Sequence, residues 1–348
     1  MRRLSDKSTI RYDYHGPFLS EVSRFSSRGR KLYSHSYQDY DARGNPCLEN
    51  GFFQTRYDYD KRGRRIYQEN PYFQEEIEYS PSGNIVRKGD RTYTYDSLSQ
   101  MTSESDQFTA AYDVHYNLIQ LNNEPIQVDC LNQIQGLAYD VNGNHWNEGF
   151  VYDEFNQLIR AHDESFTYDA LGRRIQKGNT AFLYLEDEEI GAFEEGMARQ
   201  IKIPGKNAPI TIEIKQIPYA PVIDVQGVIR SLVDVRTQKI VKQNNCDAFG
   251  MGLSDDIPYA YTGKRYDSNT GLVYFGKRYY DPIFRRWLTT DPLGPENHSN
   301  LYQYLFNSPY LYEDPSGEFA FAIPLLIWGA ELMLPTLSAK MHRFTYFF

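Results

Sequence analysis

The sequence predicts an all-β protein built as a row of β-hairpins. Its 30 Tyr and 20 Phe outnumber the 24 Gly and 17 Pro that punctuate them, and aromatic side chains favour pleated, half-buried surfaces. A short unit recurs through the first half of the chain. In addition, aromatic side chains recur at every second position in residues 91–95 and 164–168. A period of two places one set of side chains on each face of a sheet.

The recurring unit is an aromatic residue, then Asp, then two or three variable residues that often include Gly or Asn, then an aliphatic residue. We expect the aromatic residue to end one strand, the Asp side chain to cap the turn, and Gly or Asn to supply a positive φ. Copies start at Tyr40, Tyr59, Tyr95, Tyr139 and Tyr168, and looser copies start at Tyr12, Tyr79, Tyr112 and Tyr152.

The spacing of the motif tyrosines runs from 13 residues (Tyr139 to Tyr152) to 28 residues (Tyr12 to Tyr40). This irregularity argues against propeller blades and favours a variable hairpin array. Since a single hairpin is marginally stable, the units are expected to pair edge to edge in a continuous sheet. Packing and capping explain these Tyr and Asp residues without assigning them any chemistry, although stacked tyrosines leave open an adhesive or carbohydrate-binding surface.

Four regions follow along the chain. Residues 1–181 form the hairpin array, residues 182–257 a divergent β-rich continuation, residues 258–317 a separate motif-dense domain, and residues 318–348 a short tail. The tail carries an apolar stretch at 319–337, interrupted by Pro324, Gly329, Glu331 and Pro335. We expect it to be helical and to be buried or docked, with membrane contact of 319–337 left open.

Composition excludes several function classes. A formal net charge of −9 argues against a general nucleic-acid-binding surface. Cys47, Cys130 and Cys246 match no zinc spacing and are expected to be buried thiols, so neither a metal site nor a cofactor is predicted. The charged N-terminus leads into no apolar run of signal-peptide length.

The tyrosine–aspartate units resemble the YD repeats of Rhs proteins, wall-associated toxins, the Tc toxin C component and teneurins. Residues 261–282, YTGKRYDSNTGLVYFGKRYYDP, closely resemble the start of the Rhs repeat-associated core domain, and the likeness continues through RRWLTTDPLG at 285–294 to DPSG at 314–317. It covers most of residues 37–317 and is weakest from 182 to 241. There residues 222–230 retain only a weak resemblance to a segment that usually precedes the core. The DAFG sequence at 247–250 resembles the family pattern more clearly.

The resemblance implies that the repeats wind into a shell, that the core domain turns inward as a plug, and that a toxic C-terminal polypeptide is held inside. Only 31 residues follow the second DPxG motif, so we expect a partial shell whose effector is minimal or lost, and a chain that is a fragment of a larger ancestor. Expected partners are the chain's own C-terminal segment, remaining shell pieces, and an immunity protein or secretion-system component. The resemblance also implies a secreted or cell-surface location.

In several relatives the core cleaves its own chain as an aspartyl protease. The positions that match are Asp291 and Asp314 of the two DPxG motifs and Arg278, with the cut expected just after Gly317. One of two neighbouring carboxyls can stay protonated as a general acid while the other activates water, and an arginine can fix their geometry. Two observations favour a structural plug instead: DPxG is also a good β-turn, and Glu318 stands where relatives that cut usually carry an apolar residue. The enzymatic alternative is at most a single turnover.

Overall fold

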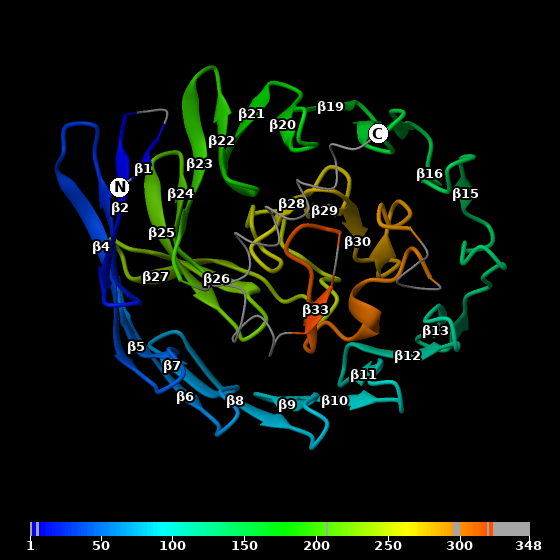
Figure 1. The fold of residues 1–348 in the computed structure, drawn as a ribbon, viewed down its shortest axis with the longest axis horizontal. Coiled ribbons are helices and arrows are strands. Elements are labelled where there is room, and N and C mark those ends of the chain that lie inside the picture. Colours follow the sequence, from blue (N-terminus) through cyan, green and yellow to red (C-terminus); the bar gives the residue numbers. More distant parts are fainter. Residues whose placement is uncertain (1, 5–6, 207, 295–299, 319, 323–348) are drawn as a thin grey trace.

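The computed structural model describes residues 2–322, except 5–6, 207, 295–299 and 319, and this part of the chain consists almost wholly of antiparallel strands (Figure 1). The all-β prediction is confirmed. The predicted helical tail and its apolar stretch lie, apart from residues 318 and 320–322, outside the described residues. Within the described part, no helix has the length and apolar character needed to cross a membrane.

The strands form two large sheets and three small ones. The first sheet contains, in order, β1 (Arg2–Arg3), β2 (Thr9–His15), β3 (Phe18–Phe25), β4 (Lys31–Tyr40), β5 (Pro46–Asn50), β6 (Gln54–Tyr59), β7 (Arg65–Asn70), β8 (Phe73–Tyr79), β9 (Ile85–Lys88), β10 (Arg91–Tyr95), β11 (Met101–Glu104), β12 (Phe108–Tyr112), β13 (Leu118–Leu121) and β14 (Glu124–Pro125). A two-stranded sheet follows, with β15 (Ala138–Tyr139) and β16 (His145–Trp146).

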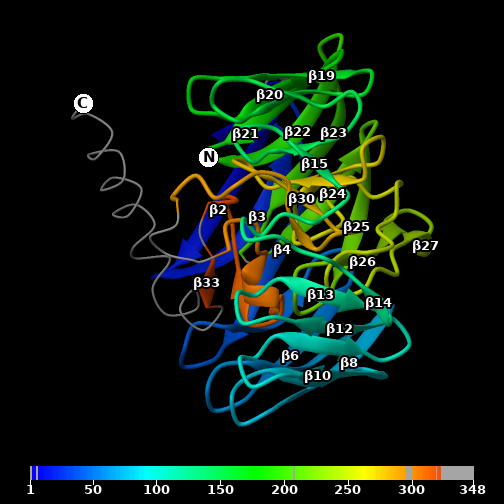
Figure 2. The same ribbon diagram turned by 90° about the vertical axis from the view of Figure 1, so that its right-hand side faces the viewer.

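The second large sheet contains β17 (Val151–Tyr152), β18 (Leu158–Ala161), β19 (Glu164–Tyr168), β20 (Arg174–Lys177), β21 (Thr180–Leu185), β22 (Glu188–Glu194), β23 (Met197–Pro204), β24 (Pro209–Ile214), β25 (Ile217–Ile223), β26 (Ile229–Asp234) and β27 (Lys239–Gln243). We call β1–β27 the wall. Each strand of a wall sheet pairs with its neighbours in sequence, as a hairpin array requires, but the wall consists of three sheets and not of the one continuous sheet that we expected. The strands lie side by side along the wall, with the hairpin turns at its edges (Figure 2).

In most repeats the Asp residue organises its turn as the motif predicts, whereas Asp13 of the copy at Tyr12 lies inside strand β2. In the turn at Asp60, the Oδ1 atom accepts hydrogen bonds from the backbone N–H groups of Arg62 (2.8 Å) and Arg64 (2.9 Å), and Gly63 has φ +82°. A turn at this place therefore needs a residue that tolerates a left-handed backbone. The same Oδ1 pattern recurs at Asp41, Asp96, Asp113, Asp129, Asp140, Asp153, Asp169, Asp224 and Asp247.

The motif tyrosines connect each hairpin to the one before it. The Tyr95 hydroxyl donates to the carbonyl oxygen of Ile85 at 2.7 Å, and Ile85 is the first residue of β9. The acceptor is likewise the first residue of an earlier strand for Tyr59, Tyr79, Tyr112, Tyr152, Tyr168 and Tyr184. This contact explains why the repeat carries Tyr, since Phe has no hydroxyl to donate.

The wall winds round until its end packs against its beginning (Figure 1). Arg24 of β3 pairs with Glu213 of β24 at 3.1 Å, and Lys88 of β9 pairs with Asp224, just after β25, at 2.9 Å. An apolar cluster joins β2–β4 to β22–β24, with Ile10 and Ile203 among its buried members. The row of hairpins thus closes into a ring.

Inside the ring lie residues 258–317, which we call the plug (Figure 1). It contains β28 (Arg265–Asp267), β29 (Leu272–Tyr274), β30 (Tyr279–Asp281) and β31 (Arg286–Trp287), the short 3-10 helix η1 (Leu305–Asn307), and β32 (Tyr312–Glu313), which pairs with β33 (Phe321–Ala322). One apolar cluster joins Phe275 and Trp287 to Met101 in the first sheet, and another joins Leu288 to Phe166 in the second. The plug therefore packs against both sheets of the wall.

The cysteines correct one expectation. All three are free, Cys246 is buried and Cys47 half-buried, but Cys130 is exposed. Its exposure follows from its place directly after Asp129 in a wall turn. Among the described residues, no group of three or more His, Cys, Asp or Glu could hold a metal ion.

Candidate functional site

The structure brings the three predicted site residues together in the plug. Arg278, which precedes β30, places one terminal nitrogen 2.8 Å from Oδ2 of Asp291 and the other 3.6 Å from Oδ2 of Asp314. All three side chains are largely withdrawn from solvent, with exposed fractions of 3%, 11% and 2%. The guanidinium carbon of Arg278 also lies 4.3 Å from the ring centre of Trp287, and this packing fixes its plane.

Asp314 organises the second DPxG segment as a turn. Its Oδ1 atom accepts hydrogen bonds from the backbone N–H groups of Gly317 at 2.7 Å and of Ser316 and Glu318 at 3.2 Å. Gly317 has φ +78°. The prediction that this motif forms a β-turn is therefore correct. The same turn places the Asp314 carboxyl next to the Gly317–Glu318 peptide bond, which is the bond that the resemblance predicts to be cleaved.

Arg278 also touches the carbonyl of that peptide bond, a contact that the sequence did not indicate. Its Nε atom donates to the carbonyl oxygen of Gly317 at 2.5 Å. One guanidinium group therefore contacts both carboxyls and the Gly317 carbonyl. A planar group with several N–H donors can hold such an arrangement, whereas a lysine cannot reproduce its geometry.

Burial shifts the pKa values of the ionisable groups in this site. Burial raises the pKa of the Asp314 carboxyl, against the opposing effect of Arg278 and of the three backbone N–H groups. Burial also lowers the pKa of the Arg278 guanidinium, while the two aspartates oppose that change. The pKa of Glu318 is raised, again chiefly by burial.

A second set of contacts ties the plug to the turns of the wall. Plug side chains donate to backbone carbonyls in five successive or near-successive Asp turns: Ser308 to Ser99, Asn307 to Tyr116 (2.9 Å), Arg286 to Asn132 (2.5 Å), Tyr302 to Gly143 (2.6 Å) and Lys277 to Leu171 (2.6 Å). Sequence reasoning missed these contacts because their partners lie between 106 and 209 residues apart.

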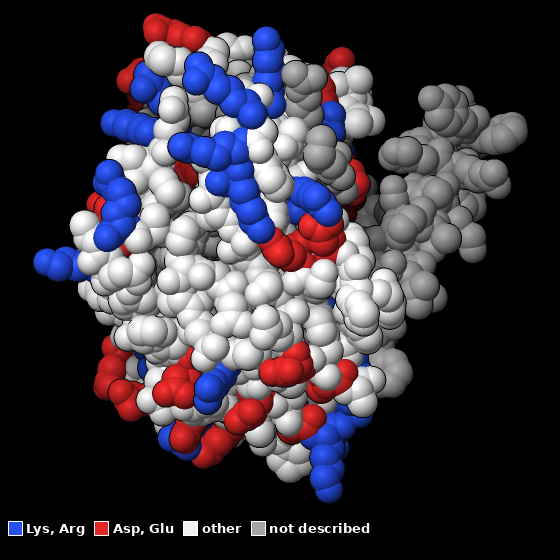
Figure 3. Space-filling model, turned by 90° about the vertical axis from the view of Figure 1, so that its left-hand side faces the viewer, with Lys and Arg blue, Asp and Glu red and all other residues white. Residues whose placement is uncertain are grey.

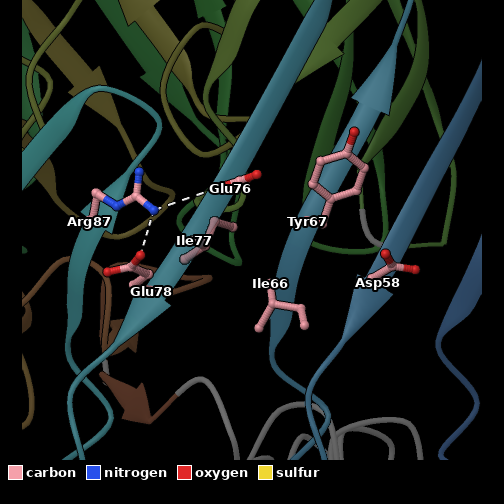
Figure 4. Close-up of a pocket in the computed structure, with 7 residues that line it drawn as sticks. All are labelled: Asp58, Ile66, Tyr67, Glu76, Ile77, Glu78 and Arg87. Atoms are coloured by element: carbon pink, nitrogen blue, oxygen red, sulfur yellow. Dashed lines mark hydrogen bonds and ion pairs between the residues drawn. The ribbon is translucent and has the colours of Figure 1, made fainter.

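The outer surface offers weaker candidates. A shallow depression of about 300 Å³ lies over β6–β9 and is lined by Asp58, Ile66, Tyr67, Glu76, Ile77, Glu78 and Arg87 (Figure 4). Arg87 is already paired with Glu78 at 2.5 Å. On the face shown in Figure 3, basic side chains gather mainly in the upper part and acidic ones mainly in the lower part, with a band of uncharged side chains between them.

No family model matches the chain. It is 24% identical over 314 residues to double-stranded DNA deaminase toxin A of Burkholderia cenocepacia, and this match covers 76% of this chain and 21% of that protein. It is 44% identical over 64 residues to toxin subunit YenC1 of Yersinia entomophaga, which covers 18% of this chain and 6% of that protein. The structure of the Photorhabdus luminescens Tc holotoxin pore superposes with a TM-score of 0.68 at 20% identity, over 89% of this chain and 21% of the solved one.

The chain is similar in sequence to Rhs-type toxins and has the fold of the Tc toxin shell. This YD-repeat chain spans about a fifth or less of the length of the curated relatives named above. The fold is shared with the Tc toxin structure over 89% of this chain.

Proposed function

We propose that this chain is the wall-and-plug segment of an Rhs-type toxin shell, whose role is to enclose or deliver the polypeptide that follows the plug. The observation that carries the proposal is the row of contacts from plug side chains to wall turns, together with the two shared apolar clusters. Remaining shell pieces are the proposed partners. In support, solved structures with a similar fold are complexes of TccC3 with TcdB2. An immunity protein or a secretion-system component is a further proposed partner.

The test is to cut the chain between wall and plug. A site for a sequence-specific protease can be inserted between Asp255 and Asp256, which are both exposed. If the plug is an integral part of the shell, the two pieces will stay together through size-exclusion chromatography after the cut and will separate only in denaturant. Separation in native buffer would contradict the proposal.

The second candidate is cleavage of the chain's own Gly317–Glu318 bond, carried by the contact from Arg278 to the Gly317 carbonyl oxygen. In this mechanism Arg278 polarises the carbonyl, Asp291 takes a proton from a water molecule, and the resulting hydroxide adds to the carbonyl carbon. Asp314 accepts a hydrogen bond from the Glu318 N–H at Oδ1 (3.2 Å), and in its protonated form it gives the proton on Oδ2 to that nitrogen as the C–N bond breaks. The products are a Gly317 carboxyl end and a Glu318 amino end.

Glu318 fits this site better than its charge suggests. Because burial raises the pKa of its carboxyl, the side chain is more easily accommodated in its neutral form beside Asp314. Cleavage is expected to slow as the pH rises above the pKa of Asp314, since the mechanism needs that carboxyl protonated.

Intact mass of the purified chain, measured beside an Asp314→Asn variant, tests the cleavage. We expect the wild-type chain to appear as two pieces divided after Gly317, and the variant as one. Both chains remaining whole would leave the plug a structural element without protease activity.

A further inference from the structure

We propose that Lys264 and Gly276 are positioning residues that hold the backbone of residues 315–317 in place for cleavage. The inference rests on the cleavage proposed above and extends it to residues that lie outside the two DPxG motifs and contact neither carboxyl.

Three consecutive carbonyl oxygens of the second DPxG segment each accept a hydrogen bond from another part of the plug. The Pro315 oxygen accepts from Nζ of Lys264, the Ser316 oxygen from the backbone N–H of Lys277 at 2.9 Å, and the Gly317 oxygen from Nε of Arg278 at 2.5 Å. Donors on successive peptide groups fix the orientation of each peptide plane. The Gly317 carbonyl therefore has little freedom to rotate away from Arg278.

Gly276 allows the two backbones to approach closely. Its φ is +116°, and a Cβ atom built there would lie 3.0 Å from the Ser316 carbonyl oxygen. A Cβ atom on Gly317 would likewise lie 3.0 Å from the backbone nitrogen of Arg278. A side chain at position 276 would push away the segment that carries the bond to be cut, and it would also strain the backbone at this φ.

Lys264 holds the far end of the segment. The first part of the plug supplies it, where its backbone N–H donates to the carbonyl oxygen of Tyr261 at 2.8 Å. Its Nζ atom also lies 5.9 Å from the ring centre of Phe275, which adjoins Gly276. Lys264 therefore links the start of the plug, the turn at 275–278 and the Pro315 carbonyl. Small errors in such positioning slow a reaction strongly, because reacting groups must lie within a narrow range of distances.

The experiment measures the rate of self-cleavage from the moment the chain is made. The full chain is produced by cell-free translation with a short radioactive pulse, and the uncut form is followed with time on denaturing gels. The variants are Lys264→Met, Lys264→Arg and Gly276→Ala, with Lys239→Met on the exposed face of β27 as the matched control. We expect cleavage to slow at least tenfold in Lys264→Met and Gly276→Ala, to recover substantially in Lys264→Arg, and to be unchanged in Lys239→Met.

Thermal unfolding of each purified variant, made with Asp291→Asn to prevent cleavage, separates positioning from stability. An unchanged rate in Lys264→Met beside a cleaving wild type would overturn the inference and leave the cleavage proposal standing. Equal slowing in Lys264→Met and Lys264→Arg, with lowered melting temperatures, would assign Lys264 a structural role and also overturn it. A wild-type chain that never cuts overturns the cleavage proposal and this inference together.

Discussion

The wall and the plug are held by contacts of different range along the chain. In the wall, an Asp side chain binds N–H groups two and four residues ahead, and a Tyr hydroxyl reaches back 10 residues in the case of Tyr95. The plug is held by partners far away in sequence, such as Arg174 with Asp267, 93 residues apart, and Arg265 with Glu189, 76 residues apart. Local contacts therefore build each hairpin of the wall, whereas the plug is held by contacts between residues that only the closed ring brings together.

The difference is clearest around Arg174, which belongs to a YD repeat but whose side chain serves the plug. Its side chain is fully buried, pairs with Asp267, and lies between 4.4 and 5.6 Å from the ring centres of Phe166, Phe182, Tyr274 and Tyr279. Aromatic faces and one carboxylate together stabilise a charge that would otherwise be costly to bury.

Breaking that pair should have the largest effect. Asp267→Asn leaves the Arg174 charge buried without its counter-ion, and we expect a loss of about 3–5 kcal/mol in the free energy of unfolding. The matched control is Asp13→Asn, which breaks the exposed pair with Arg11 and is expected to change stability by less than about 1 kcal/mol. Urea unfolding midpoints measure both. Equal effects would mean that the plug is not anchored through Arg174.

A smaller, pH-dependent effect is expected where the ring closes on itself. Burial raises the pKa of Glu75 in β8 to about 7, where Asp224 adds to the shift and Lys88, Arg230 and Arg65 oppose it. Because the folded protein holds this proton up to a higher pH than the unfolded chain does, the contribution of Glu75 to stability is full below about pH 4.5 and is lost as the pH rises through 7.

Glu75→Gln removes this titration. Between pH 4.5 and 7.5 the wild-type chain should lose on the order of 2 kcal/mol more in the free energy of unfolding than the variant does. Denaturant unfolding at the two pH values gives the comparison, with Glu69→Gln on the exposed side of β7 as control. A variant whose pH dependence matches the wild type would show that Glu75 does not titrate in this range.

The sequence predicts the local contacts of the wall well and the long-range contacts of the plug poorly. The Asp turns were predictable because Asp, a positive-φ residue and the flanking strands all lie within a few positions. The turn at Asp129 was missed, since Val128 stands where the motif has an aromatic residue. The turn nevertheless forms, with Asn132 at φ +61°, so the Asp and the positive-φ residue define the turn and the tyrosine does not.

The residues of the candidate site could likewise be predicted only in part. Asp291, Asp314 and Arg278 came from a family resemblance, and the structure places them in contact. Lys264 lies in the segment that carries the same resemblance, but the resemblance gives it no role, and its partner, the Pro315 carbonyl, is 51 residues away. Backbone carbonyls carry no sequence signature, and contacts to them become visible only in the fold.

The smallest effect concerns the wall alone. Tyr95→Phe keeps the ring and removes only the hydroxyl that donates to the Ile85 carbonyl oxygen, so we expect a loss of about 1 kcal/mol in the free energy of unfolding. Tyr14→Phe, where the side chain is exposed, should change little. If unfolding followed by hydrogen exchange shows the loss of protection in β9 and β10 and not in the plug, the tyrosine acts between neighbouring hairpins. If protection is lost equally in the plug, wall and plug unfold as one unit. The difference between local contacts in the wall and long-range contacts in the plug would then have no effect on how the protein unfolds.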